Sequence, residues 1–183
     1  MAPPQAAAAV PVEPLRFRDL MAGVCAPVTI VTTGHGDDPH GATASSLASL
    51  SLDPPLITVA FDHRSALLRR ILAAGRFGVN LLCRGQEDLA QAFATRSDDR
   101  FAGVRWHYDA GLPRLDGAAR WMACDLDRAV PGGDHLLLFG LVTAAARAEL
   151  PPLIYAHRTY GTHSRFDERP RPLIAGQIAA CSY

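Results

Sequence analysis

The stretch that decides the fold runs from Gly41 to Phe61 and reads GATASSLASLSLDPPLITVAF. Its even positions are mostly apolar and its odd positions mostly carry hydroxyl groups, a period of two that is typical of a strand with one buried face. The alternation breaks at Ser46 and Leu47, which predicts a bulge or bend. Asp53-Pro54-Pro55 then predicts an extended turn, because proline fixes φ and disfavours helix in the residue before it. Leu56 to Phe61 follows as a buried strand.

The hydroxyl-bearing face of this stretch suggests a binding surface. Short side chains leave room for a flat ring, and hydroxyls donate or accept hydrogen bonds as needed. The alternative interpretation is an ordinary half-exposed strand whose serines face water.

Composition sets bounds on the class of protein. With 183 residues the chain is expected to form one domain with a real core. The 18 arginines balance the 18 acidic residues, so no long-range field favours nucleic acid or an anionic membrane as a partner. No apolar run reaches the roughly 18 residues that a membrane span needs. Residues 1–12 lack the basic start and apolar core of a signal peptide.

The four cysteines, Cys25, Cys83, Cys124 and Cys181, are far apart and form no CxxC pair. This spacing argues against a zinc site and against a disulfide framework, so no metal is expected. A reducing cytoplasm is the simplest predicted location.

Local patterns divide the chain into a leader at 1–13, a domain at 14–163 and a tail at 164–183. Helices are expected from Pro14 to before Pro27, over 66–74 up to Gly75, and over 86–94. Strands are expected at 28–33, 41–52, 56–61, 77–82, 121–130, 135–149 and 153–156, and the segment 97–115 is expected to be loop.

Arg64 and Ser65 precede the second predicted helix. A helix N-terminus offers free N–H groups and a favourable dipole to an anion, and an arginine with a hydroxyl there could hold a phosphate. The alternative is that Ser65 or Asp62 only caps the helix and Arg64 is solvated.

About seven strands joined by short turns, with about three helices, favour an antiparallel barrel over a doubly wound parallel sheet. The chain has no G-x-G-x-x-G, no G-x-x-x-x-G-K-[ST], no H-E-x-x-H and no G-x-S-x-G.

Several segments match one known pattern in order and spacing. They are Phe17–Met21, Pro27–Thr33, Gly41–Ser46, Leu50–Leu56, Gly75–Leu82, Arg100–Gly103, Gly132–His135 and Pro152–Tyr160. This set resembles the short flavin reductases, which are the reductase partners of two-component flavin-dependent monooxygenases. The resemblance covers roughly residues 15–163.

The resemblance implies a mainly β, antiparallel Greek-key split barrel of the FMN-binding type, forming a homodimer with a flavin near the subunit interface. The positions that it assigns to FMN or FAD are Pro39, His40, Gly41, Ala42, Thr43, Ala44, Ser45, Ser46, Ser51, Asp62, Arg64, Ser65, Asn80 and Gln86. His135 matches a catalytic position near the nicotinamide, and His157 and Tyr160 border the same face.

The implied reaction is hydride transfer from C4 of NADH or NADPH to flavin N5, with reduced flavin passing by diffusion to a monooxygenase. One segment departs from the pattern. Relatives read Tyr-x-Arg-Gly-x-Tyr where this chain has Tyr155-Ala-His157-Arg158-Thr-Tyr160.

Two other functions remain open at this point. The same barrel could carry flavin or heme as an electron-transfer protein without reductase turnover. It could also be an oxidase similar to the pyridoxamine-phosphate oxidases, which share a split barrel.

Overall fold

The computed structural model describes residues 10–95 and 99–163. The helices are α1 (Pro14–Ala22), α2 (Ala66–Ala74) and α3 (Glu87–Ala94). The strands are β1 (Ala26–Pro27), β2 (Thr29–His35), β3 (Asp38–Ala44), β4 (Ala48–Leu52), β5 (Pro55–Asp62), β6 (Arg76–Leu81), β7 (Trp106–Asp109), β8 (Leu112–Leu115), β9 (Arg120–Gly132), β10 (His135–Arg147), β11 (Ile154–Ala156) and β12 (Thr159–Gly161). Most of the expected leader, the expected tail and Cys181 lie outside the described residues.

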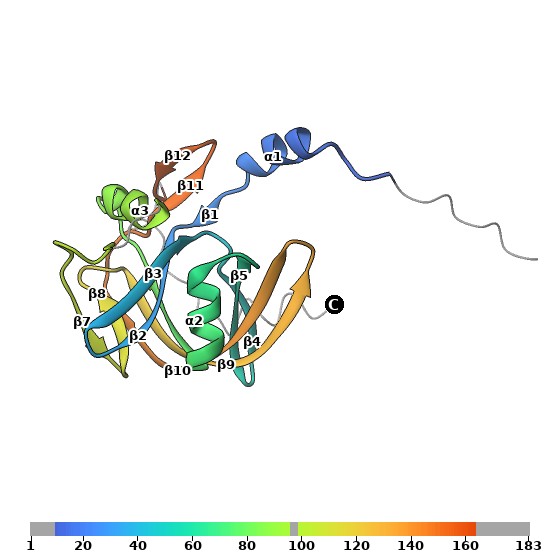
Figure 1. Ribbon diagram of the computed structural model, residues 1–183. Helices are drawn as coiled ribbons and strands as arrows, with labels where there is room; N and C mark the ends of the chain where they lie inside the picture. The colour runs from blue at the N-terminus through green and yellow to red at the C-terminus, as the bar shows by residue number, and fades with distance from the viewer. Residues whose placement is uncertain (1–9, 96–98, 164–183) are drawn as a thin grey trace, which may run out of the picture.

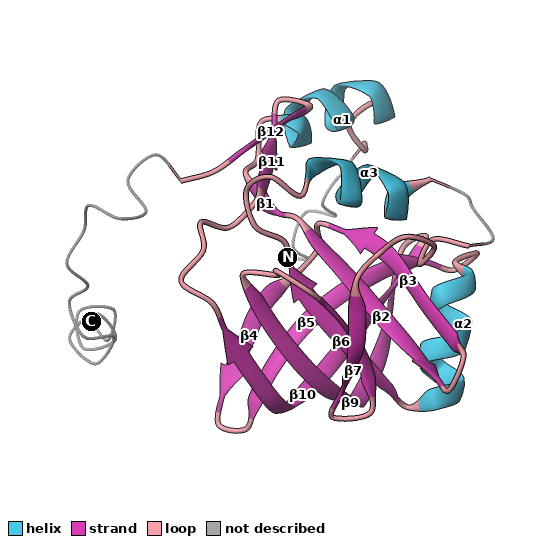
Figure 2. Ribbon diagram, turned by 90° about the vertical axis from the view of Figure 1, so that its left-hand side faces the viewer, coloured by secondary structure: helices cyan, strands magenta, loops and turns pink. Residues whose placement is uncertain are grey.

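One antiparallel sheet dominates the molecule. Its seven strands follow the order β3-β2-β6-β9-β10-β5-β4, and they curl around a common interior (Figure 2). Two small sheets, β1-β11-β12 and the β7-β8 hairpin, lie beside it. The predicted antiparallel, β-rich architecture is confirmed.

The stretch from Gly41 to Phe61 holds three strands, and its parity break is a change of strand. β3 and β4 lie at opposite edges of the seven-stranded sheet, so residues 45–47 carry the chain from one edge to the other. Ser46 Oγ accepts a hydrogen bond from the N–H of Ala60 at 2.8 Å and donates to the carbonyl of Ala60 at 3.1 Å. The bulge or bend predicted at Ser46 and Leu47 is instead the connection between β3 and β4. The expectation of one strand with a buried leucine face was wrong, because Leu50 and Leu52 on β4 are exposed.

Helix α2 packs across the curled sheet and covers the main core (Figure 1). Leu67, Leu68 and Ile71 on its inner face contact the buried residues of β2, β5, β6 and β10. Both predicted ends of α2 are confirmed. Ser65 Oγ accepts from the N–H of Leu68, and Gly75 adopts the left-handed φ of 66° that suits a residue without Cβ.

A second core cluster joins α3 to the start of the barrel. The rings of Phe93 and Phe101 meet edge to face at 5.0 Å, and Trp106 continues the series at 5.4 Å from Phe101. A Cβ at Gly41 would come within 2.7 Å of Phe93, so only glycine lets β3 approach α3 this closely. The segment expected to be loop contains the β7-β8 hairpin, whose Leu112 and Leu115 are buried.

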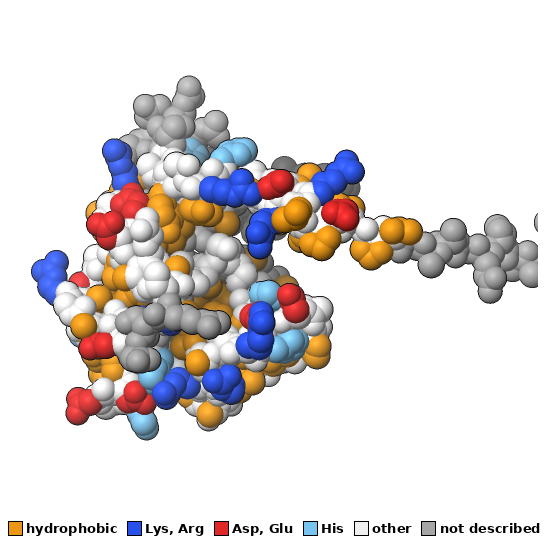
Figure 3. All heavy atoms as spheres, turned by 45° about the horizontal axis from the view of Figure 1, so that its top comes forward, with side chains coloured by type: hydrophobic (Ala, Val, Ile, Leu, Met, Phe, Trp, Pro, Cys, Tyr) orange, Lys and Arg blue, Asp and Glu red, His pale blue; other side chains and the backbone are white. Residues whose placement is uncertain are grey.

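Helix α1 stands clear of the barrel (Figure 1). None of its residues is buried, and Leu15, Phe17 and Leu20 each expose more than half of their surface. The turn between β11 and β12 holds its end, because the N–H of His157 donates to the carbonyl of Ala22 and Arg158 pairs with Asp19 at 2.6 Å. Figure 3 shows hydrophobic side chains along this arm, with no other described part of the chain over them.

Within residues 10–95 and 99–163, the model has no helix that is both long enough and apolar enough to span a membrane.

Candidate functional site

A pocket of about 370 Å³ opens beside the end of β3. We call it the ledge pocket, after the Thr43–Ser45 segment that forms one side. Its lining residues are Val28, Ala42, Thr43, Ala44, Ser45, Phe93, Ala94, Arg100, Tyr155 and Tyr160. Alanines, aromatic rings and hydroxyls alternate around it, a lining typical of sites for flat, partly polar ligands.

Hydrogen bonds fix the walls of the ledge pocket. Thr43 Oγ1 donates to the carbonyl of Ala90 on α3 at 2.6 Å, which ties the ledge to that helix. Tyr155 and Tyr160 stand as a cross-strand pair with ring centroids 5.0 Å apart. Burial raises the pKa of the Tyr160 hydroxyl, so Tyr160 stays protonated and presents a neutral face.

Among the described residues, Arg100 is the one charged side chain in the lining of the ledge pocket. Its Nη1 donates to the carbonyl of Gly41 at 2.7 Å, and its Nε donates to the carbonyl of Thr95 at 2.9 Å. Both partners are neutral carbonyls, so the positive charge of Arg100 is not cancelled by them. The guanidinium therefore both fixes β3 against the end of α3 and brings a cation to the pocket.

A charged cluster lies where β5 runs into α2. The backbone N–H, Nε and Nη2 of Arg64 all donate to the carboxylate of Asp62, at 2.7, 3.0 and 2.7 Å. These bonds hold the pKa of Asp62 well below its usual range and raise the pKa of Arg64. Ser65 follows as the N-cap, and the first turn of α2 behind it has N–H groups without intrahelical partners.

His135 belongs to this cluster. It stands opposite Asp62 in the β10-β5 ladder, and its Nδ1 lies 2.7 Å from Asp134 Oδ1. That contact lowers the pKa of Asp134. Ser46 connects the cluster with the ledge, because its partner Ala60 is two residues before Asp62 on β5.

The remaining residues assigned by the resemblance lie elsewhere. Asn80 is fully buried, with its amide bonded to the carbonyl of Ile30 and the N–H of Leu115, so it is a core residue and cannot reach a ligand. Gln86 bonds to the N–H of Cys83 and the carbonyl of Asp116 and stabilises its own turn. Gly41 is buried against Phe93.

Four further assigned residues are outside the ledge pocket. Pro39 and His40 lie near the β2-β3 turn, where His40 pairs with Asp38 at 2.7 Å and lines a different pocket. Ser51 is on the edge strand β4. His157 is in the β11-β12 turn, in the small β1-β11-β12 sheet, whereas His135 is at the start of β10 in the seven-stranded sheet.

Sequence reasoning gave no role to Arg100, Phe93 or Tyr155, although all three line the ledge pocket. Arg100 lies inside the 97–115 region that was expected to be loop. The signal available was its position next to the buried aromatic Phe101, which fixes the backbone and aims the preceding side chain.

These features together define a curled antiparallel barrel with a hydroxyl-lined pocket, a pair of neighbouring tyrosine rings, and a helix start that carries Arg64 and Ser65, as suits a flat, phosphorylated ring compound.

Comparison with known proteins identifies the family. Residues 21–164 match the model of the flavin reductase like domain. The reductase subunit HsaB of a flavin-dependent monooxygenase from Mycobacterium tuberculosis is 34% identical over 164 residues, 89% of this chain and 79% of that protein. A probable flavin reductase from Rhizobium meliloti is 34% identical over 168 residues, 91% of this chain and 54% of that longer protein.

A solved structure shares the fold. The NADH:FAD oxidoreductase SgcE6 of Streptomyces globisporus C-1027, in complex with NAD and FAD fragments, superposes with a TM-score of 0.80 at 30% identity. The match covers 88% of this chain and all of that one. The chain therefore belongs to the flavin reductase family, and the resemblance and the split-barrel fold predicted from its sequence are confirmed.

Proposed function

We propose that the ledge pocket and the Asp62–Ser65 cluster form one flavin site, at which the chain catalyses NAD(P)H-dependent reduction of flavin for a partner monooxygenase. Family membership supports the reaction class. The observation that carries the placement is the hydrogen-bonded link from Ser46 to Ala60, which joins the hydroxyl ledge to the strand leading to Arg64 and Ser65.

The residues present fit a flavin. The ring would lie against the short side chains of Ala42–Ser45, and a phosphate would meet Ser65, Arg64 and the first N–H groups of α2. Arg64 is already oriented by Asp62, which reduces the freedom it would lose on binding. The bound flavin and nicotinamide supply the hydride chemistry, and the protein binds and orients them.

Arg100 and the two tyrosines are our candidates for the nicotinamide nucleotide. The pyrophosphate of NADH or NADPH is best bound by a cation, and Arg100 brings a positive charge to the pocket lining. Tyr155 and Tyr160 offer aromatic faces for a ring of the same ligand. His135, on the opposite side of the Ser46 link, remains a candidate for orienting a ligand near the flavin phosphate end.

We further propose that the protein works as a homodimer in a reducing compartment such as the cytoplasm. The exposed apolar side chains of α1 are the surface that a second copy would cover. The cysteines among the described residues, Cys25, Cys83 and Cys124, are free thiols, in keeping with that location.

Steady-state oxidation of NADH and NADPH at about 340 nm, with FMN, FAD or riboflavin added, tests the reaction and identifies both substrates. We expect saturable turnover that depends on added flavin. Flavin binding without NAD(P)H turnover would support the carrier alternative, and oxygen consumption without NAD(P)H would support the oxidase alternative.

Ser46→Trp tests the placement of the site. The indole would fill the ledge and abolish flavin binding, measured by the quenching of flavin fluorescence. Ser46→Ala is the matched control, because it removes the same two hydrogen bonds to Ala60 without adding bulk. Loss of binding in the tryptophan variant alone supports the ledge, and normal affinity in that variant contradicts it.

Arg100→Met tests the nucleotide assignment. We expect KM for the nicotinamide nucleotide to rise about tenfold or more, as a lost charge-assisted contact implies, with flavin affinity changed much less. Arg105→Met is the control, since Arg105 is exposed and outside the pocket. Equal effects on both ligands would indicate that Arg100 only holds β3 against α3.

A further inference from the structure

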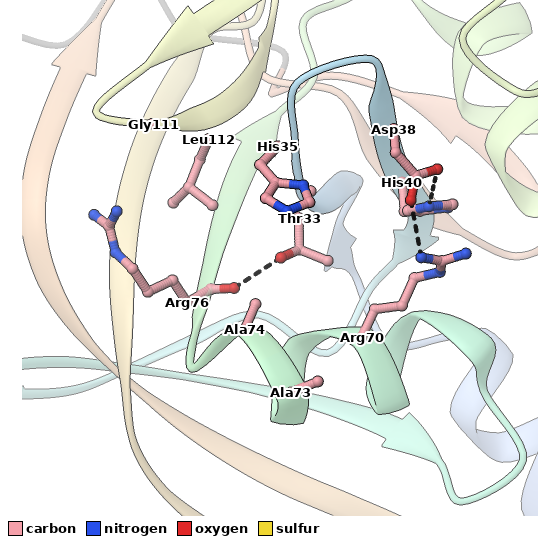
Figure 4. A pocket seen from close by; sticks show the side chains of 11 residues that line it. Thr33, His35, Asp38, His40, Arg70, Ala73, Ala74, Arg76, Gly111 and Leu112 are labelled. Carbon is pink, nitrogen blue, oxygen red and sulfur yellow. Dashed lines mark hydrogen bonds and ion pairs between the residues drawn. The ribbon is translucent and has the colours of Figure 1, made fainter.

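A second cavity, of about 440 Å³, lies on the other side of the barrel mouth, between the last turn of α2, the β2-β3 turn and the β7-β8 hairpin (Figure 4). We call it the α2 pocket. It shares no lining residue with the ledge pocket. β3 contributes to both, with Asp38 and His40 here and Ala42, Thr43 and Ala44 there. The flavin site proposed above uses none of its polar groups, and its volume is in the range of small-molecule sites, about 300–1,000 Å³.

The floor of the α2 pocket is apolar. Ala73 and Ala74 form it from the helix, and Leu112 faces them from the hairpin with the ring of His35 beside it (Figure 4). The hydroxyl of Thr33 is already used, because it donates to the carbonyl of Arg76 at 3.0 Å. This end of the cavity therefore suits a hydrocarbon or aromatic body that needs no hydrogen bonds.

The polar end carries donors. Arg70 reaches from α2 toward Asp38, with its Nη1 3.2 Å from Asp38 Oδ2, and His40 lies 2.7 Å from the other oxygen of the same carboxylate. The Arg70 contact is single and longer than the 2.7–2.9 Å usual for charge-assisted bonds. Both Arg70 and Asp38 are about half exposed or more, so Asp38 can turn into water and release the guanidinium.

The charges around the α2 pocket determine which kind of ligand it suits and at which end of the pocket a charged group would lie. Arg76 also lines the cavity, but its Nε lies 2.7 Å from Asp125 Oδ1, a shorter contact than the 3.2 Å between Arg70 and Asp38, so Arg70 is the cation more easily released to a ligand. Asp38 competes for Arg70, and the negative end of the α2 dipole lies over Ala73 and Ala74. An anionic group would therefore lie at Arg70 and His40, away from the helix end, with its apolar body on the alanines. One guanidinium fork and one imidazole fit a planar carboxylate better than a phosphate, which needs more donors.

We propose that the α2 pocket is a second ligand site, for a small aromatic carboxylate whose carboxylate displaces Asp38 from Arg70. This site is independent of the flavin site and does not rest on the reductase reaction.

The test is binding of benzoate to the full chain without flavin or NAD(P)H, followed by amide chemical shifts. We expect saturable shifts at Thr33, Gly34, Ala73, Ala74 and Gly111, and much smaller ones with benzyl alcohol, which has the ring without the charge. Arg70→Gln should weaken binding about tenfold or more. Ala73→Phe, at an exposed helical position, should abolish binding by filling the floor.

Arg147→Gln is the charge-matched control, since Arg147 is exposed on β10 and outside the pocket, and it should bind benzoate normally. The proposal is overturned if benzoate does not bind, if its shifts map to the ledge pocket, or if Arg70→Gln and Ala73→Phe bind as tightly as the parent. NAD(P)H oxidation, measured separately on the same variants, should be unchanged, so failure here and failure of the reductase proposal are distinguishable.

Discussion

Helices α1 and α2 each span nine residues, yet they have opposite relations to the barrel. α2 buries Leu67, Leu68 and Ile71 and is capped by Ser65 and Gly75. α1 buries nothing, and Glu13 gives it no side-chain cap. Short isolated helices are marginal in water, and within residues 10–95 and 99–163 no surface buries the apolar side chains of α1. The comparison separates α2, which belongs to the fold of one chain, from α1, which is the surface that the proposed homodimer would cover.

Thiol reactivity should show the largest difference between the two regions. Cys124 packs in the core cluster that contains Leu67, Leu68 and Ile71, and burial raises its pKa to about 12. Because the thiolate is the reactive form, at pH about 8 Cys124 should react over about a thousandfold more slowly than an exposed thiol of ordinary pKa, about 8.5. Cys25, exposed beyond α1, should be labelled readily.

Timed alkylation of a Cys181→Ser variant, read by mass spectrometry of peptides, measures this difference. Rapid labelling of Cys124 under native conditions would show that α2 does not seal the core.

Truncation of the buried helix face should cost the most stability. Ile71→Ala leaves a cavity under α2 and should lower the free energy of unfolding by about 2–5 kcal/mol. Leu20→Ala on α1 is the counterpart and should change unfolding of the dilute protein by less than about 0.5 kcal/mol. Urea denaturation followed by far-ultraviolet circular dichroism compares them. Similar losses of unfolding free energy in the two variants would contradict the difference drawn between α1 and α2.

Formation of the proposed dimer should depend on α1, which packs on none of the described core. If a second copy covers α1, Leu20→Ser removes about 1.5–3 kcal/mol of apolar burial from the interface, roughly a tenfold or greater loss of dimer affinity. Sedimentation velocity over a range of concentrations measures it. Leu72→Ser, an exposed leucine on the outer face of α2, is the control. An unchanged dimer, or a parent protein that is monomeric, would contradict the role of α1.

The helix ends provide a finer test. Gly75→Ala places a Cβ at φ 66° and should destabilise the protein by about 1 kcal/mol. Gly23 ends α1 at φ −81°, which any residue adopts, and the nearest atom to an added Cβ is 3.4 Å away in His157. Gly23→Ala should therefore be neutral to within about 0.5 kcal/mol. Thermal unfolding of the two variants distinguishes a required glycine from a dispensable one.

The smallest effect is expected at the turn that holds α1. His157 and Arg158 have φ values of 51° and 59°, and Arg158 occupies the position that is glycine in the family pattern. Arg158→Gly relieves strain but loses the exposed pair with Asp19, terms of about 1 kcal/mol each and of opposite sign. We expect a change in Tm of only a few degrees. A large loss would mean that the Asp19 pair positions α1 by itself.

Sequence reasoning succeeded where a signal was local. The ends of α2 depend on a few adjacent residues, and both were predicted; β9 and β10 were predicted as strands at 121–130 and 135–149. The β7-β8 hairpin was missed, although its Ala110-Gly111 turn has the positive φ values of a tight hairpin, because its strands are only four residues long.

Signals that depend on topology were harder to interpret. The break at Ser46 was visible, but parity cannot show that the strands before and after it lie at opposite edges of a sheet. Similarly, Asn80 stood out as a polar residue in an apolar strand. Its two buried partners, Ile30 and Leu115, are 50 and 35 residues away in sequence, so its structural role was invisible before folding.

The double hydrogen bond between Ser46 and Ala60 also limits which residues position 46 can accept. One side-chain group accepts from the N–H and donates to the carbonyl of the same residue, Ala60, as a residue on a neighbouring strand would. Among the neutral side chains of that reach, only the hydroxyls of serine and threonine do both with a single rotatable atom. Among variants at this position, serine and threonine should therefore be the most stable, whereas Ser46→Ala should still fold with a modestly lower stability, because it loses only these two exposed hydrogen bonds.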